Sequence, residues 1–365
     1  MINMLDLKEE FIEIEAEVID TVVNILKSTR YILGPHVEGF EQELALYNGV
    51  EYAVGVASGT SALHLSLAAI DVAKGDEVIT TPFTFFASIE SILYRGAKPV
   101  FVDIDKHTLN INTDLIEENI TNKTKAIIPV HLFGLPCNME AIIKISDKYG
   151  LAIIEDCAQS FGSTYKGKHT GSFGTTGCFS FYPSKNLGCY GDGGAVITNN
   201  RNIDEKIKRL RNHGASASYT HDVVGFNSRL DEIQAGILRI KLKKIDEKNS
   251  LRRKNVLLYN EYLTGYVTTP IEPEGYISNY HQYTIRSPRR EAIKQALSKE
   301  DIASVVYYPI PMHMQNALDG LYKEGDFPIA EEAARQVLSL PIYPGMQAND
   351  IEKICQVIIR CLNEG

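Results

Sequence analysis

The sequence lacks the features that mark several large classes of protein. Its six cysteines include no C-x-x-C pair, so neither a disulfide framework nor a zinc site is indicated. It has no apolar run of about 18 residues, the length that a membrane-spanning helix needs. The first residues, MINMLDLKEE, place acids where a signal peptide has a basic start and an apolar core. We therefore expect a cytoplasmic protein that does not enter the membrane.

An excess of basic residues is missing too. The 365-residue chain has 37 Lys and Arg against 46 Asp and Glu, a formal net charge of −9 at pH 7. Nucleic-acid-binding proteins usually show clustered positive charge, so we expect no nucleic-acid partner. No H-E-x-x-H motif or EF-hand loop occurs, and GSTYKGKH ends in His169 where a P-loop has Ser or Thr. We predict no metal ligands, and a hairpin at residues 165–168.

Residues 52–200 alternate short β-branched runs with helical stretches. This alternation predicts βαβ units around a central, mostly parallel, seven-stranded sheet flanked by helices, an α/β fold. The runs are YAVGVAS, DEVITTP, PVFVDI, KAIIPVHLFG, LAIIED, TTGCFSF and GGAVITN.

Helical patterns flank this region on both sides. An amphipathic helix is expected before residue 30, and one long helix at 238–263 is expected to link two parts of the chain. We predict a large cofactor-binding domain at 1–245, with the N-terminal helices, and a smaller α+β domain at 246–365.

Polar residues stand at the ends of three of the predicted strands. In open α/β sheets, ligands bind beyond the carboxyl ends of the strands. Gly59 and Thr60 open a helix directly after a strand, where free backbone N–H groups favour a phosphate, and Ser180 would add another donor. Asp156 follows an apolar strand, so its carboxylate needs a cation, although a helix cap is the plainer interpretation.

Lys185 is the most informative residue, because Asp156 precedes it at such a strand end. Pyridoxal 5′-phosphate enzymes need a lysine for the Schiff base and a carboxylate that faces the pyridinium nitrogen. One Lys and one Asp do not establish such a site by themselves. Whether Lys185 and Asp156 form such a cofactor site therefore has to be judged from the segments around them.

The surrounding segments resemble the DegT/DnrJ/EryC1/StrS family of sugar aminotransferases over nearly the whole chain. The similar segments are GTSALHL, TPFTFFAS, EDCAQSFG, FYPSKNLG, NSRLDEIQAG and YPIPMH. The resemblance implies the PLP-dependent transferase fold type I, and amino transfer from L-glutamate, which becomes 2-oxoglutarate, to a nucleotide-linked keto sugar. Pyridoxamine 5′-phosphate is the intermediate form of the cofactor, and Lys185 would act as proton shuttle.

The resemblance also implies roles for residues that the pattern alone leaves open. Phe85 would stack on the pyridine ring, although a core Phe is the plainer interpretation, and Gln159 would reach the phenolic oxygen of the cofactor. Asn227 would contact the cofactor phosphate of the other subunit in a homodimer with shared active sites. The residues expected to line the substrate pocket are Arg229, Tyr307, Tyr308, His313 and Tyr190.

The sequence leaves the substrate open. A 3-keto sugar is favoured, either a UDP-linked 2-acetamido-3-keto hexose, possibly its uronate, or a dTDP-linked 3-keto-6-deoxyhexose. Tyr307 stands where the uronate enzymes are expected to have His, whereas their Arg is retained as Arg229. A 4-keto sugar and a non-catalytic, cofactor-binding regulator are the alternatives.

Overall fold

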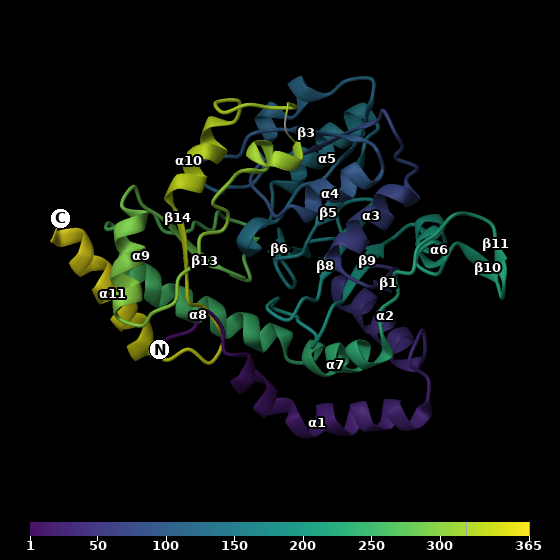
Figure 1. Cartoon of the computed structure of the whole chain (residues 1–365), viewed down its shortest axis with the longest axis horizontal. Helices are drawn as coiled ribbons and strands as arrows, with labels where there is room; N and C mark the ends of the chain where they lie inside the picture. The colour runs from purple at the N-terminus through teal and green to yellow at the C-terminus, as the bar shows by residue number, and fades with distance from the viewer. Residues whose placement is uncertain (319, 365) are drawn as a thin grey trace.

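A seven-stranded sheet forms the centre of the larger part of the molecule (Figure 1). The computed structural model describes residues 1–318 and 320–364. The strand order is β1-β9-β8-β5-β4-β2-β3, and only β9 runs antiparallel to its neighbours. The strands are β1 Tyr52–Val56, β2 Glu77–Thr80, β3 Lys98–Phe101, β4 Thr124–Ile127, β5 Ala152–Asp156, β8 Thr176–Ser180 and β9 Gly194–Thr198. The predicted sheet is confirmed.

Helices cover both faces of this sheet because successive side chains of a strand point to opposite faces. Cys178 of β8 packs in one cluster with helices α3 and α6, whereas its neighbour Phe179 packs in another with α2 and α7. Helix α5 packs on the same face as α2 and α7, farther along the sheet. These helices are α2 Pro35–Asn48, α3 Gly59–Ala69, α4 Ala87–Tyr94, α5 Met139–Tyr149, α6 Arg201–Leu210 and α7 Glu232–Leu242.

A second hydrophobic core lies at the C-terminal end of the chain. Strands β13 and β14 pair antiparallel there, and helices α8, α9 and α11 pack around them (Figure 1). Helix α10 packs instead with residues of the large domain, including Phe83 and Phe101. The elements are α8 Ile245–Leu263, β13 Tyr283–Arg286, α9 Arg290–Lys299, α10 Pro328–Gln336, β14 Val337–Leu340 and α11 Ala348–Asn363.

The helix expected at 238–263 is two helices. Helix α7 ends at Leu242 and α8 begins at Ile245, so the chain turns at Lys243 and Lys244. Helix α8 contributes to both cores, since Ile245 packs with the sheet and Val256 packs in the small domain. The boundary predicted at 245/246 thus falls at the start of a helix that both domains share.

The remaining elements are short, apart from the N-terminal helix. Helix α1 packs against α7, and residues 164–169 form the predicted hairpin. None of the described helices is long and apolar enough to span a membrane. These elements are α1 Leu7–Ser28, β6 Thr164–Tyr165, β7 Lys168–His169, β10 Ala215–Ala217, β11 Thr220–His221, β12 Tyr276–Ile277, and the 3-10 turns η1 Thr113–Leu115, η2 Glu117–Asn119, η3 Leu132–Gly134, η4 Met312–Met314 and η5 Asn316–Leu318.

Candidate active site

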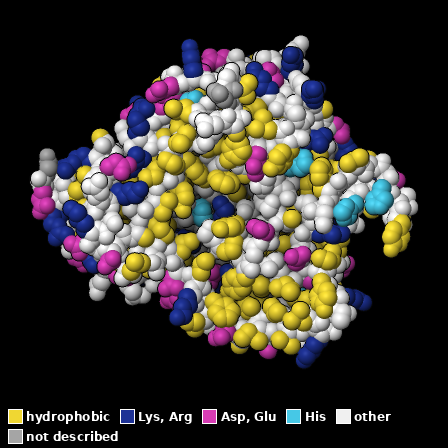
Figure 2. All heavy atoms as spheres, viewed as in Figure 1, with side chains coloured by type: hydrophobic (Ala, Val, Ile, Leu, Met, Phe, Trp, Pro, Cys, Tyr) yellow, Lys and Arg dark blue, Asp and Glu magenta, His cyan; other side chains and the backbone are white. Residues whose placement is uncertain are grey.

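A cavity of about 630 Å³ opens where the carboxyl ends of β5 and β8 meet the start of α3. Figure 2 shows a hollow near the centre of this face, with histidine and basic side chains at its floor. Nine of the residues predicted from the sequence line this cavity. They are Gly59, Thr60, Phe85, Asp156, Gln159, Ser180, Lys185, Tyr307 and Tyr308. The fold therefore brings residues from five separate segments to one place.

The start of α3 forms one end of the cavity. Ser58 caps the helix by accepting the N–H of Ser61. In the described chain, no acceptor bonds to the N–H groups of Gly59 and Thr60, as expected for the first turn of a helix. A Cβ atom on Gly59 would lie 2.7 Å from the Cβ of Ser180, so this close approach requires glycine. The arrangement presents free donors and a positive helix end to an anion.

Asp156, the last residue of β5, is 5 % exposed. Its carboxylate accepts the Ser88 hydroxyl at 2.8 Å and the N–H of Ala158 at 3.1 Å. Burial raises the pKa of Asp156, while these two hydrogen bonds and the charge of Lys185 oppose the rise. A cation in the cavity would stabilise the charged form of this carboxylate.

Lys185 lies in the loop after β8, where it is half-buried and lines the cavity. Burial lowers the pKa of Lys185 to about 8, against the opposing charge of Asp156. An amine with this pKa is partly unprotonated near neutral pH, so it can act as a nucleophile and as a base.

The opposite wall of the cavity is aromatic. Phe85 has 59 % of its surface exposed, although it lies beside the cavity, so one face of its ring is uncovered. Gln159 accepts the N–H of Phe133 at 2.6 Å and donates to the Tyr308 hydroxyl at 3.1 Å. Because the Tyr308 oxygen accepts that bond, its own proton remains available to a ligand.

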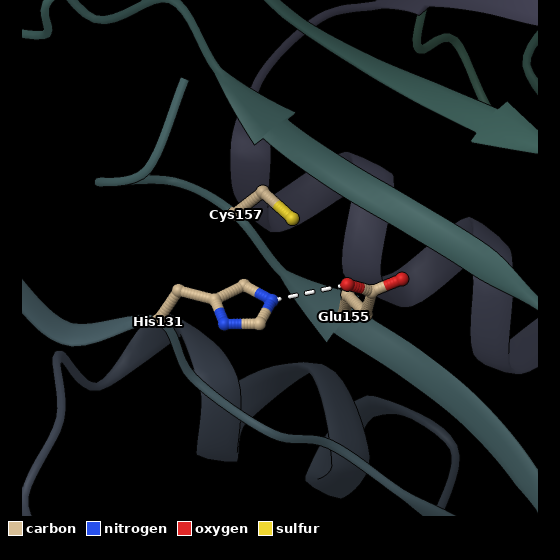
Figure 3. A group of neighbouring side chains, drawn as sticks. All are labelled: His131, Glu155 and Cys157. Atoms are coloured by element: carbon tan, nitrogen blue, oxygen red, sulfur yellow. Dashed lines mark hydrogen bonds and ion pairs between the residues drawn. The ribbon is translucent and has the colours of Figure 1, made fainter. Parts of the chain in front are cut away.

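Three buried side chains that do not line the cavity lie within reach of one metal ion, namely His131, Glu155 and Cys157 (Figure 3). His131 contacts Glu155 at 3.1 Å through Nε2, and its Nδ1 accepts the N–H of Cys137. The same carboxylate accepts the backbone N–H groups of Gly171, Phe173 and Gly174, at 2.7 to 2.8 Å. Both ring nitrogens and both carboxylate oxygens are thus bonded within the protein, and burial raises the pKa of the Cys157 thiol. The cluster orders the loop at 171–174.

Two predicted substrate residues point away from the cavity in this structure. Tyr190 packs with Phe11 of α1, and the ammonium of Lys241 lies over its ring. His313 is 2 % exposed and contacts Glu331 at 3.0 Å through Nε2. Helix α10 supplies that glutamate, so the histidine is used to join two segments instead of facing the cavity.

Asn227 and Arg229 also lie outside the cavity of their own chain. Arg229 donates to Asn227 at 2.7 Å and to Asn212 at 2.9 Å, and the Asn227 side chain is exposed. This placement leaves the predicted contact with a second subunit as a prediction.

Sequence reasoning missed several residues of the cavity region. Ser88 bonds to Asp156 from α4, 68 positions earlier in the chain, and no local pattern signals that contact. His281 and Gln282 enter the cavity just before β13. A His-Gln pair directly before an apolar strand could have indicated that these two residues line the site. The polar Asn186, directly after the lysine, could have indicated a residue near the site in the same way.

The sheet order, the free N–H groups at the start of α3, and the pair Asp156 and Lys185 together define a pyridoxal-phosphate-dependent transferase of fold type I. A model of the DegT/DnrJ/EryC1/StrS aminotransferase family matches residues 12–359, and the chain belongs to that family. The chain is therefore an aminotransferase by family.

Relatives with assigned names cover nearly the full chain. UDP-N-acetyl-3-dehydro-alpha-D-glucosamine 3-aminotransferase of Acidithiobacillus ferrooxidans is 46% identical, over 99% of this chain and 98% of that protein. A "pleiotropic regulatory protein" of Geobacillus stearothermophilus is 45% identical, over 97% and 98%. A dTDP-3-amino-3,4,6-trideoxy-alpha-D-glucose transaminase of Streptomyces venezuelae is 41% identical, over 95% and 92%. The enzymes among these relatives support transamination of a nucleotide sugar.

Solved structures agree with this assignment. S. venezuelae DesV, solved in complex with a ketimine intermediate, has a TM-score of 0.97 and 39% identity, over 99% of this chain and 98% of that one. NtdA of Bacillus subtilis, solved with bound cofactor PMP, has a TM-score of 0.91 and 30% identity, over 96% and 82%. The family and these neighbours point to pyridoxal phosphate as the cofactor.

The cavity of this chain fits that cofactor. The free N–H groups of α3 and the close approach of Gly59 to Ser180 suit its phosphate, and the exposed ring of Phe85 suits its aromatic face. Asp156 offers the carboxylate for a protonated ring nitrogen, and Lys185 offers the amine.

Proposed function

We propose that this protein transfers the amino group of L-glutamate to the keto group of a nucleotide-linked 3-keto hexose. The observation that carries the proposal is that Lys185, Asp156 and the open end of α3 line one cavity with Phe85. Bound pyridoxal phosphate supplies a ring that withdraws electrons from the carbon bearing the amino group. Asp156 keeps the ring nitrogen protonated, and Lys185 carries the proton to and from the reacting carbon.

The charge of the cavity wall favours a sugar without a carboxylate. Lys185 is the one Lys or Arg among the described residues that line the cavity, and the wall also contains Asp156 and Asp192. Arg229, the predicted partner for a uronate carboxylate, bonds within its own loop. This charge argues against the uronate. Between the two sugars without a carboxylate, we place the UDP-linked 2-acetamido-3-keto hexose first and the dTDP-linked 3-keto deoxyhexose second, because the relative named for the first is 46% identical and the one named for the second is 41% identical.

The test follows the absorbance of the bound cofactor. Adding L-glutamate to the purified enzyme with pyridoxal phosphate is expected to remove its visible band, and the correct keto sugar nucleotide to restore it. Lys185→Ala is expected to slow the glutamate step by on the order of 10³-fold or more, since it removes the proton carrier. Lys166→Ala, at an exposed hairpin lysine, is the matched control and is expected to react like the unmodified enzyme.

A regulatory function is the second candidate, because one relative is named a regulatory protein. A regulator would bind pyridoxal phosphate without reacting with L-glutamate or any keto sugar nucleotide. An unmodified protein that retains its visible band through the full substrate panel would therefore refute the aminotransferase proposal and favour the regulator.

The proposal includes a homodimer with shared active sites. Helix α1 buries Ile14 and Val18 but leaves Ile12 and Ile19 largely exposed, and Figure 2 shows hydrophobic side chains gathered over this helix. The exposed Asn227 lies outside its own cavity, as a residue for the partner's site should. An apolar outward face of this kind is typical of a protein–protein interface.

Dimers that contain two different variants test whether the active sites are shared between subunits. Lys185→Ala chains and Asn227→Ala chains are each expected to have low activity. Refolded together in equal amounts, they should regain about a quarter of the normal activity, because half of the dimers then contain one intact site. Activity no higher than the mean of the two separate variants would show that each chain forms its own site.

A further inference from the structure

Asp156 lies at the end of a short chain of buried hydroxyl groups. Its Oδ2 accepts the Ser88 hydroxyl at 2.8 Å, and the Ser88 hydroxyl lies 3.0 Å from the Thr84 hydroxyl. Thr84 and Ser88 are 1 % and 0 % exposed. A serine hydroxyl has a single proton, and Ser88 gives it to the carboxylate, so the Thr84 hydroxyl must be the donor to Ser88. Both hydrogen bonds therefore point from Thr84 toward Asp156.

This direction matches a charged Asp156. An ionised carboxylate only accepts hydrogen bonds, whereas a protonated one has an O–H group that could donate to Ser88 and reverse the chain. The other carboxylate oxygen accepts the backbone N–H of Ala158, a bond that cannot reverse. Burial raises the pKa of Asp156, and the bond from Ser88 is the largest of the effects that lower it. Ser88 thus opposes the effect of burial on this carboxylate.

The two groups that donate to Asp156 are neutral. The Ser88 hydroxyl and the Ala158 N–H favour the charged form of the carboxylate without supplying a counter-ion. The carboxylate therefore stays available to a cationic ligand. Thr84 and Asp156 line the cavity, but Ser88 does not. The Ser88 side chain can thus act on a bound ligand only through the side chains that it contacts.

We propose that Ser88 is a positioning residue for Asp156, and that the chain from Thr84 through Ser88 holds this carboxylate ionised and in a fixed orientation for the ring nitrogen of pyridoxal phosphate. Its effect on catalysis rests on the proposed aminotransferase function. The cofactor withdraws electrons best when its ring nitrogen is protonated, and an ionised Asp156 favours a proton on that nitrogen. Ser88 therefore influences the proton between Asp156 and the ring without lining the cavity itself.

Two forms of the cofactor separate this effect from a general role in folding. One is pyridoxal phosphate, and the other is an analogue with a C–H group in place of the ring nitrogen. Only pyridoxal phosphate offers Asp156 a cationic partner, so its complex favours the charged carboxylate, whereas the analogue favours a neutral one. The ratio of the two affinities therefore reports the stability of charged Asp156. Both are measured by equilibrium titration of the cofactor-free full chain, without any substrate.

Ser88→Ala should reduce the preference for pyridoxal phosphate over the analogue by about tenfold, because it removes a hydrogen bond to a charged group. Ser91→Ala is the matched control. Ser91 is equally buried in α4 and donates to the Ser88 carbonyl at 3.0 Å, so its loss should leave the preference unchanged. An equal loss of both affinities in Ser88→Ala, an unchanged preference, or the same fall in Ser91→Ala would overturn the proposal.

Substitutions at Thr84 test the direction of the chain. Thr84→Val keeps the shape of the side chain but cannot donate to Ser88, so the preference should fall by about two- to fivefold. Thr84→Ser retains the hydroxyl and should keep the preference close to that of the unmodified protein. A preference no higher in Thr84→Ser than in Thr84→Val would show that Thr84 is not part of the chain.

The two proposals fail in different ways. If the unmodified enzyme does not react with L-glutamate, the proposed amino donor is wrong, yet the two affinities still decide whether Ser88 acts through Asp156. If the enzyme reacts normally and Ser88→Ala leaves the preference unchanged, only the role of Ser88 is wrong.

Discussion

The two walls of the cavity differ in how the chain builds them. One wall consists of strand ends and a helix start in the large domain, where Asp156, Ser180 and Gly59 are fixed by the sheet itself. The other comes from loops near the small domain, represented by His281 and Tyr308, and is fixed by side-chain hydrogen bonds over long sequence distances. The first wall suits the cofactor that a whole family shares, and the second suits a substrate that differs among members.

Among the substitutions that compare the two walls, Gly59→Ala should have the largest effect. The new Cβ would lie 2.7 Å from the Cβ of Ser180, a conflict between two short side chains that cannot rotate away. Overpacking of this kind costs about 1 to 3 kcal/mol, so affinity for pyridoxal phosphate should fall by about ten- to a hundredfold.

Gly39→Ala in α2 is the matched control for this experiment. Its Cβ would meet the guanidinium of Arg239, the movable end of a flexible side chain, so cofactor affinity should not change. Titration of the visible absorbance with pyridoxal phosphate measures both variants. Equal affinities in the two variants would contradict the assignment of the α3 start to the cofactor.

The pH dependence of cofactor attachment to Lys185 tests the wall that we assign to the cofactor. Only the unprotonated amine of Lys185 reacts, and its pKa is lowered to about 8 by burial. The rate of attachment to the cofactor-free chain should therefore be about a tenth of its maximum at pH 7, rise through pH 8 and level off above about pH 9. Asp156→Asn should move the midpoint to lower pH, because the charge of Asp156 raises the lysine pKa. A rate that continues to rise up to about pH 10, where an exposed lysine loses its proton, would show that burial does not lower the pKa of Lys185.

Tyr308→Phe should have the smallest effect, and only on the sugar step. The variant loses the hydroxyl that accepts from Gln159, worth about 1 kcal/mol, so the sugar step should slow by about five- to tenfold. Tyr307→Phe is the matched neighbour, since its hydroxyl has no bond to another described residue, and it should change the rate less than Tyr308→Phe does. An equal loss in the glutamate step would break the division of the cavity into a cofactor wall and a substrate wall.

The features that could be predicted from the sequence belong mostly to the large-domain wall of the cavity. Each strand of the sheet, and the placement of Asp156 and Ser180 at strand ends, could be predicted because strand periodicity and strand-end chemistry are local. Ser88 could not be found, because its bond to Asp156 joins residues 68 positions apart. His313 and Tyr190 do not line the cavity of their own chain, for a related reason. Both are polar residues in motif-bearing loops, but distant elements, α10 and α1, determine which way their side chains face.

The break between α7 and α8 was also beyond the sequence pattern. Residues 238–263 are helix-forming throughout, and the turn at Lys243 and Lys244 interrupts a charged stretch with no Gly or Pro to mark it. Packing determines this break, because α7 and Ile245 pack against the large-domain core while the rest of α8 leaves it for the small domain.

Helix α8 therefore connects the two domains rigidly. Over its 19 residues, Asn249 bonds to Phe161 in the large domain, and Arg252 and Asn255 bond to the carbonyls of Ile342 and Tyr343 near the small-domain core. A single rigid rod embedded in both cores resists rotation of one domain against the other, unlike the hinged enzymes that close around their substrates. Substrates should thus enter by movement of loops at the cavity mouth, and amide hydrogen exchange along α8 should stay uniformly slow with and without ligand.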